Sequence, residues 1–138
     1  MTMNTHPYGA GSPITVSLAP YSRDFERFEQ DLNGEAISPI PTTVRRIDRL
    51  AKAHDASHYL LIPQGIVKPK NAEDVADIMR SAFHTGMGVT FRSGGTSLSG
   101  QAQSDQVLVD TRQNFRGIKV LDGGARVRVQ PGATIGMV

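Results

Sequence analysis

The strongest hydrophobic pattern in the chain lies between residues 71 and 86. Apolar side chains recur there at the spacing of one helical face, at Val75, Ile78, Met79, Ala82 and Phe83. Asn71 is a suitable N-cap, and Glu73 and Asp74 suit the positive end of a helix dipole. Because Gly86 follows the last apolar position, the pattern predicts a helix that ends there and buries this stripe.

Two shorter helical patterns precede this one. In residues 21–32 the apolar positions Phe25, Phe28 and Leu32 share a face. In residues 44–52 the apolar stripe consists of Val44, Ile47, Leu50 and Ala51, with Thr42 or Thr43 as the cap. The opposite face of this second helix is basic, with Arg45, Arg46, Arg49 and Lys52. We interpret the basic face as solvated, and a surface for a membrane or an anionic partner is the open alternative.

Short apolar runs predict strands around the long helix. They occupy residues 66–67, 89–92 and 107–110, so the order is strand, helix, strand, loop, strand, which is typical of parallel pairing. Residues 118–121 and 125–130 alternate apolar and polar positions around Asp122-Gly123-Gly124, which predicts a β-hairpin. The expected fold class is α+β, with a small mixed sheet whose parallel strands are flanked by helices.

Composition excludes several classes of function. The 138 residues suit one domain, and 15 basic against 13 acidic residues leave a net charge of +2 without a dense basic block, which disfavours nucleic acid as a partner. There is no cysteine, so disulfides and thiolate metal sites are excluded. The chain has no signal-peptide pattern and no apolar run of membrane-spanning length. We therefore expect a cytoplasmic protein, with peripheral attachment to the inner face of the membrane left open.

The segment with the clearest chemistry is a loop of small residues, Ser93-Gly94-Gly95-Thr96-Ser97-Leu98-Ser99-Gly100-Gln101. Adjacent glycines let successive backbone N–H groups converge on one point, which makes an anion-binding concavity. Serine and threonine hydroxyls add donors, and no acidic residue lies between Arg92 and Gln103. The composition favours a pyrophosphate, although a glycine-serine loop can also be a flexible surface turn.

Better-known glycine motifs do not fit this loop. The dinucleotide fingerprint G-x-G-x-x-G has a different glycine spacing. The phosphate loop of nucleoside triphosphatases needs a lysine where this chain has Gln101, and a serine-hydrolase elbow would need a glycine at Ser99. The loop is therefore neither a nicotinamide-dinucleotide fingerprint nor a hydrolase motif.

Residues 89–101, Val-Thr-Phe-Arg-Ser-Gly-Gly-Thr-Ser-Leu-Ser-Gly-Gln, resemble the FAD-pyrophosphate loop of another family. This is the type 2 (PCMH-type) FAD-binding flavoproteins of the vanillyl-alcohol oxidase superfamily, and the branch of the glycolate oxidases and D-lactate dehydrogenases is the most similar. The resemblance extends through Asp55-Ala56-Ser57, Val67-Lys68-Pro69, Glu73-Asp74-Val75, residues 107–110 and Gln130-Pro131-Gly132-Ala133.

The resemblance implies a two-lobed FAD domain of which residues 43–138 are most of the first lobe. A disordered tail over residues 1–19 and an N-terminal helix with its connecting segment over residues 20–42 would precede it. The loop backbone would hold the pyrophosphate, and the end of the first parallel strand would lie near the adenosine. The implied cofactor-binding residues are Arg92, Ser93, Gly94, Gly95, Thr96, Ser97, Ser99, Gly100, Gln101, Val67 and Pro69.

Covalent relatives carry a histidine in a Gly-Gly-His-Ser version of the loop, whereas this chain has Thr96, so the resemblance implies noncovalent FAD. It also implies oxidation of a small 2-hydroxy acid such as D-lactate or glycolate, with an external electron acceptor. The segment after Gly132 starts a further helix at the end of the chain, which suggests a truncated domain. A binding module without catalysis and a self-associating fragment remain alternatives.

No catalytic residue and no metal site are predicted in this chain. His54 and His58 have the i, i+4 spacing of a helical metal site, but no third ligand is near them in the sequence. Asp55 and Asp110 are isolated carboxylates. Arg126 and Arg128 are expected to be solvent-exposed on the hairpin.

Overall fold

The computed structural model describes residues 22–34 and 37–138, so the predicted tail over residues 1–19 lies outside the described residues. The elements, in chain order, are α1 (Arg23–Asn33), β1 (Thr42–Thr43), α2 (Arg46–Ala51), β2 (Gly65–Val67), α3 (Ala72–Thr85), β3 (Val89–Arg92), β4 (Val107–Asp110), β5 (Ile118–Leu121), the 3-10 turn η1 (Asp122–Gly124), β6 (Arg126–Val129) and the 3-10 turn η2 (Ile135–Met137).

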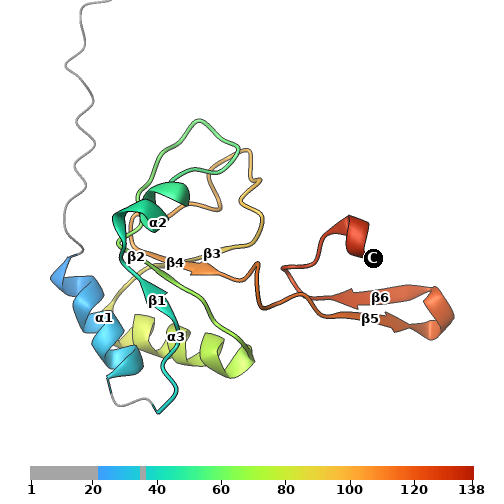
Figure 1. The fold of residues 1–138 in the computed structure, drawn as a ribbon, viewed down its shortest axis with the longest axis horizontal. Helices are drawn as coiled ribbons and strands as arrows, with labels where there is room; N and C mark the ends of the chain where they lie inside the picture. Colours follow the sequence, from blue (N-terminus) through green and yellow to red (C-terminus); the bar gives the residue numbers. More distant parts are fainter. Residues whose placement is uncertain (1–21, 35–36) are drawn as a thin grey trace, which may run out of the picture.

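A four-stranded sheet with the order β1-β2-β4-β3 forms the centre of the molecule (Figure 1). Strands β2, β4 and β3 are parallel, and β1 pairs antiparallel with β2, so the predicted mixed sheet is confirmed. Adjacent parallel strands need crossover connections. Helix α3 provides the crossover from β2 to β3, whereas the loop over residues 93–106 provides the crossover from β3 to β4.

Helices α1 and α3 pack together with the sheet in one hydrophobic core (Figure 1). Phe25 and Phe28 of α1 are fully buried, and their rings lie 5.7 Å apart. Strand β2 begins with Gly65 because a Cβ there would lie 2.0 Å from the Phe25 ring. The buried members of this core are Phe25, Phe28, Leu32, Ile40, Val67, Ile78, Ala82, Met87, Val107 and Val109.

The two longer helices begin and end near their predicted bounds. Ser22 caps α1, and the Asn71 side chain caps α3 by accepting from the Asp74 N–H at 2.7 Å. The predicted apolar stripe of α3 is only partly buried, since Phe83 is 86% exposed and Met79 is also exposed. The helix meets the core through Ile78, Ser81 and Ala82, a narrower face than the periodicity predicted.

The predicted orientation of α2 is wrong. Arg49, expected on a solvated basic face, is only 8% exposed, and its Nε donates to the Pro63 carbonyl at 2.6 Å. Ile47, expected in the buried stripe, is 61% exposed. The predicted cap is wrong too, because Thr43 lies in β1 and Arg45 stands at the N-cap without a side-chain bond. A buried carbonyl requires a donor, and Arg49 provides it for Pro63.

The predicted hairpin is confirmed as strands β5 and β6, which pair antiparallel with Ile118 opposite Val129 and Val120 opposite Val127. The hairpin extends away from the four-stranded sheet (Figure 1). Both Arg126 and Arg128 are exposed, as expected. Beyond Gly132 the chain forms the 3-10 turn η2 instead of the predicted helix. Over the described ranges, 22–34 and 37–138, no helix has the length and apolar character needed to cross a membrane.

Candidate functional site

The loop over residues 93–106 leaves the sheet at the carboxyl end of β3, the edge at which β2 and β4 also end. Open α/β sheets bind ligands at this edge. The backbone N–H groups of Gly94, Gly95, Thr96 and Ser97 donate to no other group in the part of the chain that the structure describes. Four consecutive N–H donors are therefore available to an anion.

Gly95 has a backbone conformation that only glycine adopts readily, with φ at +68°. A Cβ at this position would lie 2.3 Å from the Arg92 guanidinium, so the loop backbone rests directly on that side chain. Both the torsion angle and the close contact make Gly95 necessary for this loop shape.

Arg92 is buried, only 8% exposed, and its side chain lies inside the loop. One guanidinium nitrogen donates to the carbonyl oxygens of His54 at 2.9 Å, Ala102 at 3.1 Å and Lys52 at 3.3 Å. Among the described residues no carboxylate forms an ion pair with Arg92. The predicted site residue thus supplies an uncompensated positive charge beneath the loop.

The loop hydroxyls have different surroundings. Ser97 Oγ accepts from the Ser99 and Gln101 N–H groups at 3.3 and 3.2 Å and donates to the Gln101 side chain, which closes a turn. Ser93 Oγ donates to the Pro131 carbonyl at 2.5 Å. Thr96 and Ser99 are exposed. Of the predicted hydroxyl donors, Thr96 and Ser99 are thus the accessible ones, and Ser93 and Ser97 shape the loop.

Val67 and Pro69 lie at the same edge of the sheet but are enclosed by protein. Both side chains are fully buried, and the Pro69 carbonyl accepts from Asn114 Nδ2 at 2.9 Å. Their predicted contact with an adenosine stays a prediction. Gly100 lies farther along the loop, where its carbonyl accepts from the Gln103 N–H at 3.4 Å.

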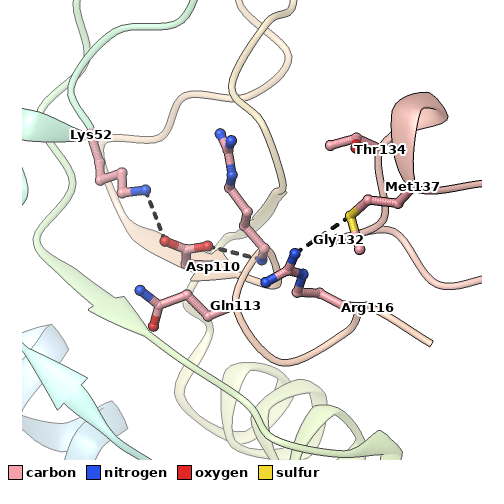
Figure 2. Close-up of a pocket in the computed structure, with 8 residues that line it drawn as sticks. Lys52, Asp110, Gln113, Arg116, Gly132, Thr134 and Met137 are labelled. Atoms are coloured by element: carbon pink, nitrogen blue, oxygen red, sulfur yellow. Dashed lines mark hydrogen bonds and ion pairs between the residues drawn. The ribbon is translucent and has the colours of Figure 1, made fainter.

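A cavity of about 270 Å³ opens beyond the end of β4 (Figure 2). Lys52 Nζ lies 2.9 Å from Oδ2 of buried Asp110, and Asp110 Oδ1 accepts from the Arg112 N–H at 3.1 Å. The lining is rich in basic side chains and consists of Lys52, Asp110, Arg112, Gln113, Arg116, Gly132, Thr134 and Met137. The sequence showed Lys52 and Asp110 as unrelated residues, because 58 positions separate them, counted as 110 minus 52.

Asp55 supports the loop from the opposite side to the solvent. Its carboxylate accepts from the Ser57 N–H at 2.9 Å, Gln103 Nε2 at 2.7 Å and the Ala102 N–H at 3.3 Å. Burial alone would raise the pKa of Asp55, but these hydrogen bonds outweigh burial and hold its pKa well below the ordinary value. Sequence reasoning set Asp55 aside; a carboxylate two residues before Ser57 is, however, the signature of an Asx turn.

The remaining histidines do not form the predicted alternatives. Helix α2 ends at Ala51, so His54 and His58 do not share a helical face. His84 lies in the last turn of α3, and its Nδ1 is 3.5 Å from Asp31 Oδ2.

A glycine loop with free N–H groups at the carboxyl edge of a parallel sheet is typical of a domain that binds a phosphorylated cofactor. Residues 63–138 match the family described as the FAD binding domain, and this chain belongs to that family. The predicted family is thereby confirmed, and FAD is the cofactor of the family.

Two curated relatives are D-2-hydroxyglutarate dehydrogenases. The chain is 36% identical to the Haemophilus influenzae protein over 89 residues, which are 62% of this chain, and 36% identical to the Escherichia coli protein over 95 residues, which are 66% of it. The match spans 9% of the length of each relative. Neither relative is named for lactate or glycolate, the substrates suggested by the sequence.

The fold is also similar to that of p-cresol methylhydroxylase with substrate bound. The TM-score is 0.61 at 16% identity, and the match covers 82% of this chain and 23% of the other. The predicted PCMH-type α+β fold is thus confirmed.

Proposed function

We propose that the chain binds the pyrophosphate of FAD with the loop over residues 93–101 and forms part of a flavin-dependent oxidoreductase that oxidises a 2-hydroxy acid. The observation that carries the cofactor site is the set of four consecutive free N–H groups from Gly94 to Ser97 above buried Arg92. Both features stabilise a dianionic group, and neither requires a side chain to move.

Each part of the loop has a distinct role in this proposal. Arg92 fixes the loop through three backbone carbonyls and adds positive charge below it. Thr96 and Ser99 present accessible hydroxyls beside the N–H groups. When bound, FAD supplies the acceptor for the two electrons removed from a substrate. This chain supplies binding and orientation, and no catalytic residue is assigned to it.

The substrate class is a 2-hydroxy acid because the curated relatives are named for D-2-hydroxyglutarate. Within that class we propose D-2-hydroxyglutarate ahead of D-lactate and glycolate. The test uses the full-length protein, loaded with FAD and kept free of oxygen. D-2-hydroxyglutarate should bleach the flavin absorbance at least about tenfold faster than either smaller acid, since a lost ionic contact costs of that order. Equal rates for all acids would contradict the substrate assignment.

The cofactor site is tested by titrating the 138-residue chain with FAD and following flavin fluorescence. Gly95→Asp should raise the Kd at least about tenfold, because it adds a carboxylate beside the phosphates and a Cβ that overlaps Arg92. Gly86→Asp is the matched control: Gly86 also has positive φ, at +73°, but has open space around it at the end of α3.

Gly86→Asp should lose a similar amount of stability and keep the FAD affinity. If both variants bind FAD as the unchanged chain does, residues 93–101 do not hold the pyrophosphate. If the unchanged chain binds no FAD, the site requires sequence beyond these 138 residues.

A further inference from the structure

The Gly-Ser loop is tied to residues 52–57, a segment 38 or more positions earlier in the sequence. Arg92 at the start of the loop donates to the Lys52 and His54 carbonyls. In the middle of the loop the Ser97 carbonyl accepts from the Ala56 N–H at 3.0 Å. The end of the loop, at Ala102 and Gln103, donates to Asp55. The segment therefore contacts the loop at its beginning, middle and end.

The Ala102 peptide joins the two buried charges of this network. Its carbonyl accepts from Arg92 at 3.1 Å, and its N–H donates to Asp55 at 3.3 Å. Gln103 Nε2 reaches both Asp55 and Ser57 Oγ, at 2.7 and 3.0 Å. Without these bonds the crossover over residues 93–106, which contains no helix or strand, would sample many conformations.

We propose that Asp55 is a positioning residue that holds the loop with its N–H groups converged before the anion arrives. The proposal rests on the proposed function, because it takes the anion to be the FAD pyrophosphate. Asp55 does not contact the ligand itself: it faces Ser57, Ala102 and Gln103 and is buried. A preformed loop binds with less loss of conformational entropy than a loop that orders on binding.

A carboxylate suits this role because every group that faces it is a donor. Oδ1 accepts from the Ser57 N–H and Gln103 Nε2, and Oδ2 accepts from the Ala102 N–H. In Asp55→Asn one oxygen becomes an NH₂ group, which is also a donor, so at least one of these contacts becomes repulsive. The shape of the side chain is kept, and the loop attachment is weakened.

Stopped-flow binding of FAD to the 138-residue chain separates positioning from ligand contact. If Asp55→Asn lowers the fraction of chains with a competent loop, the apparent affinity falls by that fraction. We expect the association rate constant to fall at least about tenfold, the scale of one lost charged hydrogen bond, with the dissociation rate constant unchanged within about twofold. The matched control is Asp105→Asn, an exposed carboxylate at the end of the same loop, which should change neither rate.

Other outcomes overturn the proposal. A faster dissociation with unchanged association would mean that Asp55 contacts the ligand. A lower binding stoichiometry with unchanged affinity would mean that Asp55 serves the fold alone, and unchanged rates would mean that it does not position the loop. If Asp55→Asn does not fold, Gln103→Ala removes one donor of the same carboxylate and should slow association in the same direction by a smaller factor.

Amide hydrogen exchange of the ligand-free chain separates failure of this proposal from failure of the proposed function. Asp55→Asn should speed exchange at Ala102 and Ser57, whose N–H groups the carboxylate holds, and Asp105→Asn should not. Unchanged exchange overturns the positioning role even if FAD binds. Faster exchange in a chain whose wild type binds no FAD would leave the attachment of the loop established and reject the cofactor assignment for the isolated chain.

Discussion

Arg92 and Asp55 are both buried charged residues, and neither is neutralised by the other through an ion pair. Each instead bonds to backbone groups of the loop and of residues 52–57. A buried charge is tolerated when hydrogen bonds satisfy it, and these bonds fix a loop that has no regular structure. The shape of the candidate site thus depends on side chains that lie behind it.

At this scale the sequence predicted the binding surface and missed its support. Adjacent glycines are visible locally because the left-handed conformation of Gly95 requires glycine. The role of Asp55 depends on Ala102 and Gln103, which lie 47 and 48 positions away. A contact between distant residues leaves no periodic or local signal, so Asp55 looked like an isolated carboxylate.

Thr96 leads to a prediction about how the cofactor is attached. Its side chain is exposed where covalent relatives in the resemblance carry histidine, and a threonine hydroxyl lacks the imidazole nucleophile. We propose noncovalent FAD. After loading and acid precipitation, all flavin should appear in the supernatant, measured by absorbance. Thr96→Ser is the control and should behave identically; flavin retained on the precipitated chain would reject the proposal.

At the scale of elements, periodicity predicted the long helices and the parallel strands better than it predicted α2. Helix α1 buries Phe25 and Phe28, as the spacing indicated. Helix α2 has only six residues, so its apolar stripe is short, and a hydrogen bond from Arg49 to the Pro63 carbonyl accompanies the opposite orientation. In short helices, single polar contacts can decide which face is buried, and hydrophobic spacing does not report them.

The hairpin of β5 and β6 should be the least stable sheet of the described chain. It pairs only with itself, and its side chains are mostly exposed, whereas β4 is buried along its whole length. An isolated two-stranded hairpin is marginal in water. Amide exchange should therefore be at least about tenfold faster at Val120 and Val127 than at Leu108, since local opening costs less than global unfolding. Equal protection would show that the hairpin folds as one unit with the core.

At the scale of the whole molecule, exposed apolar side chains gather on one face of this hairpin. Ile118, Val120, Val127 and Val129 pair across the two strands, and Val120 is 65% exposed. The other face carries Lys119, Arg126 and Arg128. Each strand also has an unpaired edge. Apolar surface next to open strand edges favours association with another chain.

We therefore predict that the 138-residue chain self-associates through this face at micromolar concentrations. Sedimentation velocity should show a weight-average mass that rises with concentration. Val120→Lys with Val127→Lys should return the chain to the monomer, because two charges would have to be buried in the contact. Lys119→Val is the opposing control on the other face and should not reduce association.

FAD titration of the same variants relates association to the proposed site. The loop over residues 93–101 contacts Pro131 through Ser93, but none of its hydrogen bonds involves β5 or β6. The monomeric Val120→Lys and Val127→Lys chain should therefore bind FAD with unchanged affinity. Loss of binding together with loss of association would mean that a second copy completes the site, whereas a monomeric unchanged chain at all concentrations would reject association through the hairpin.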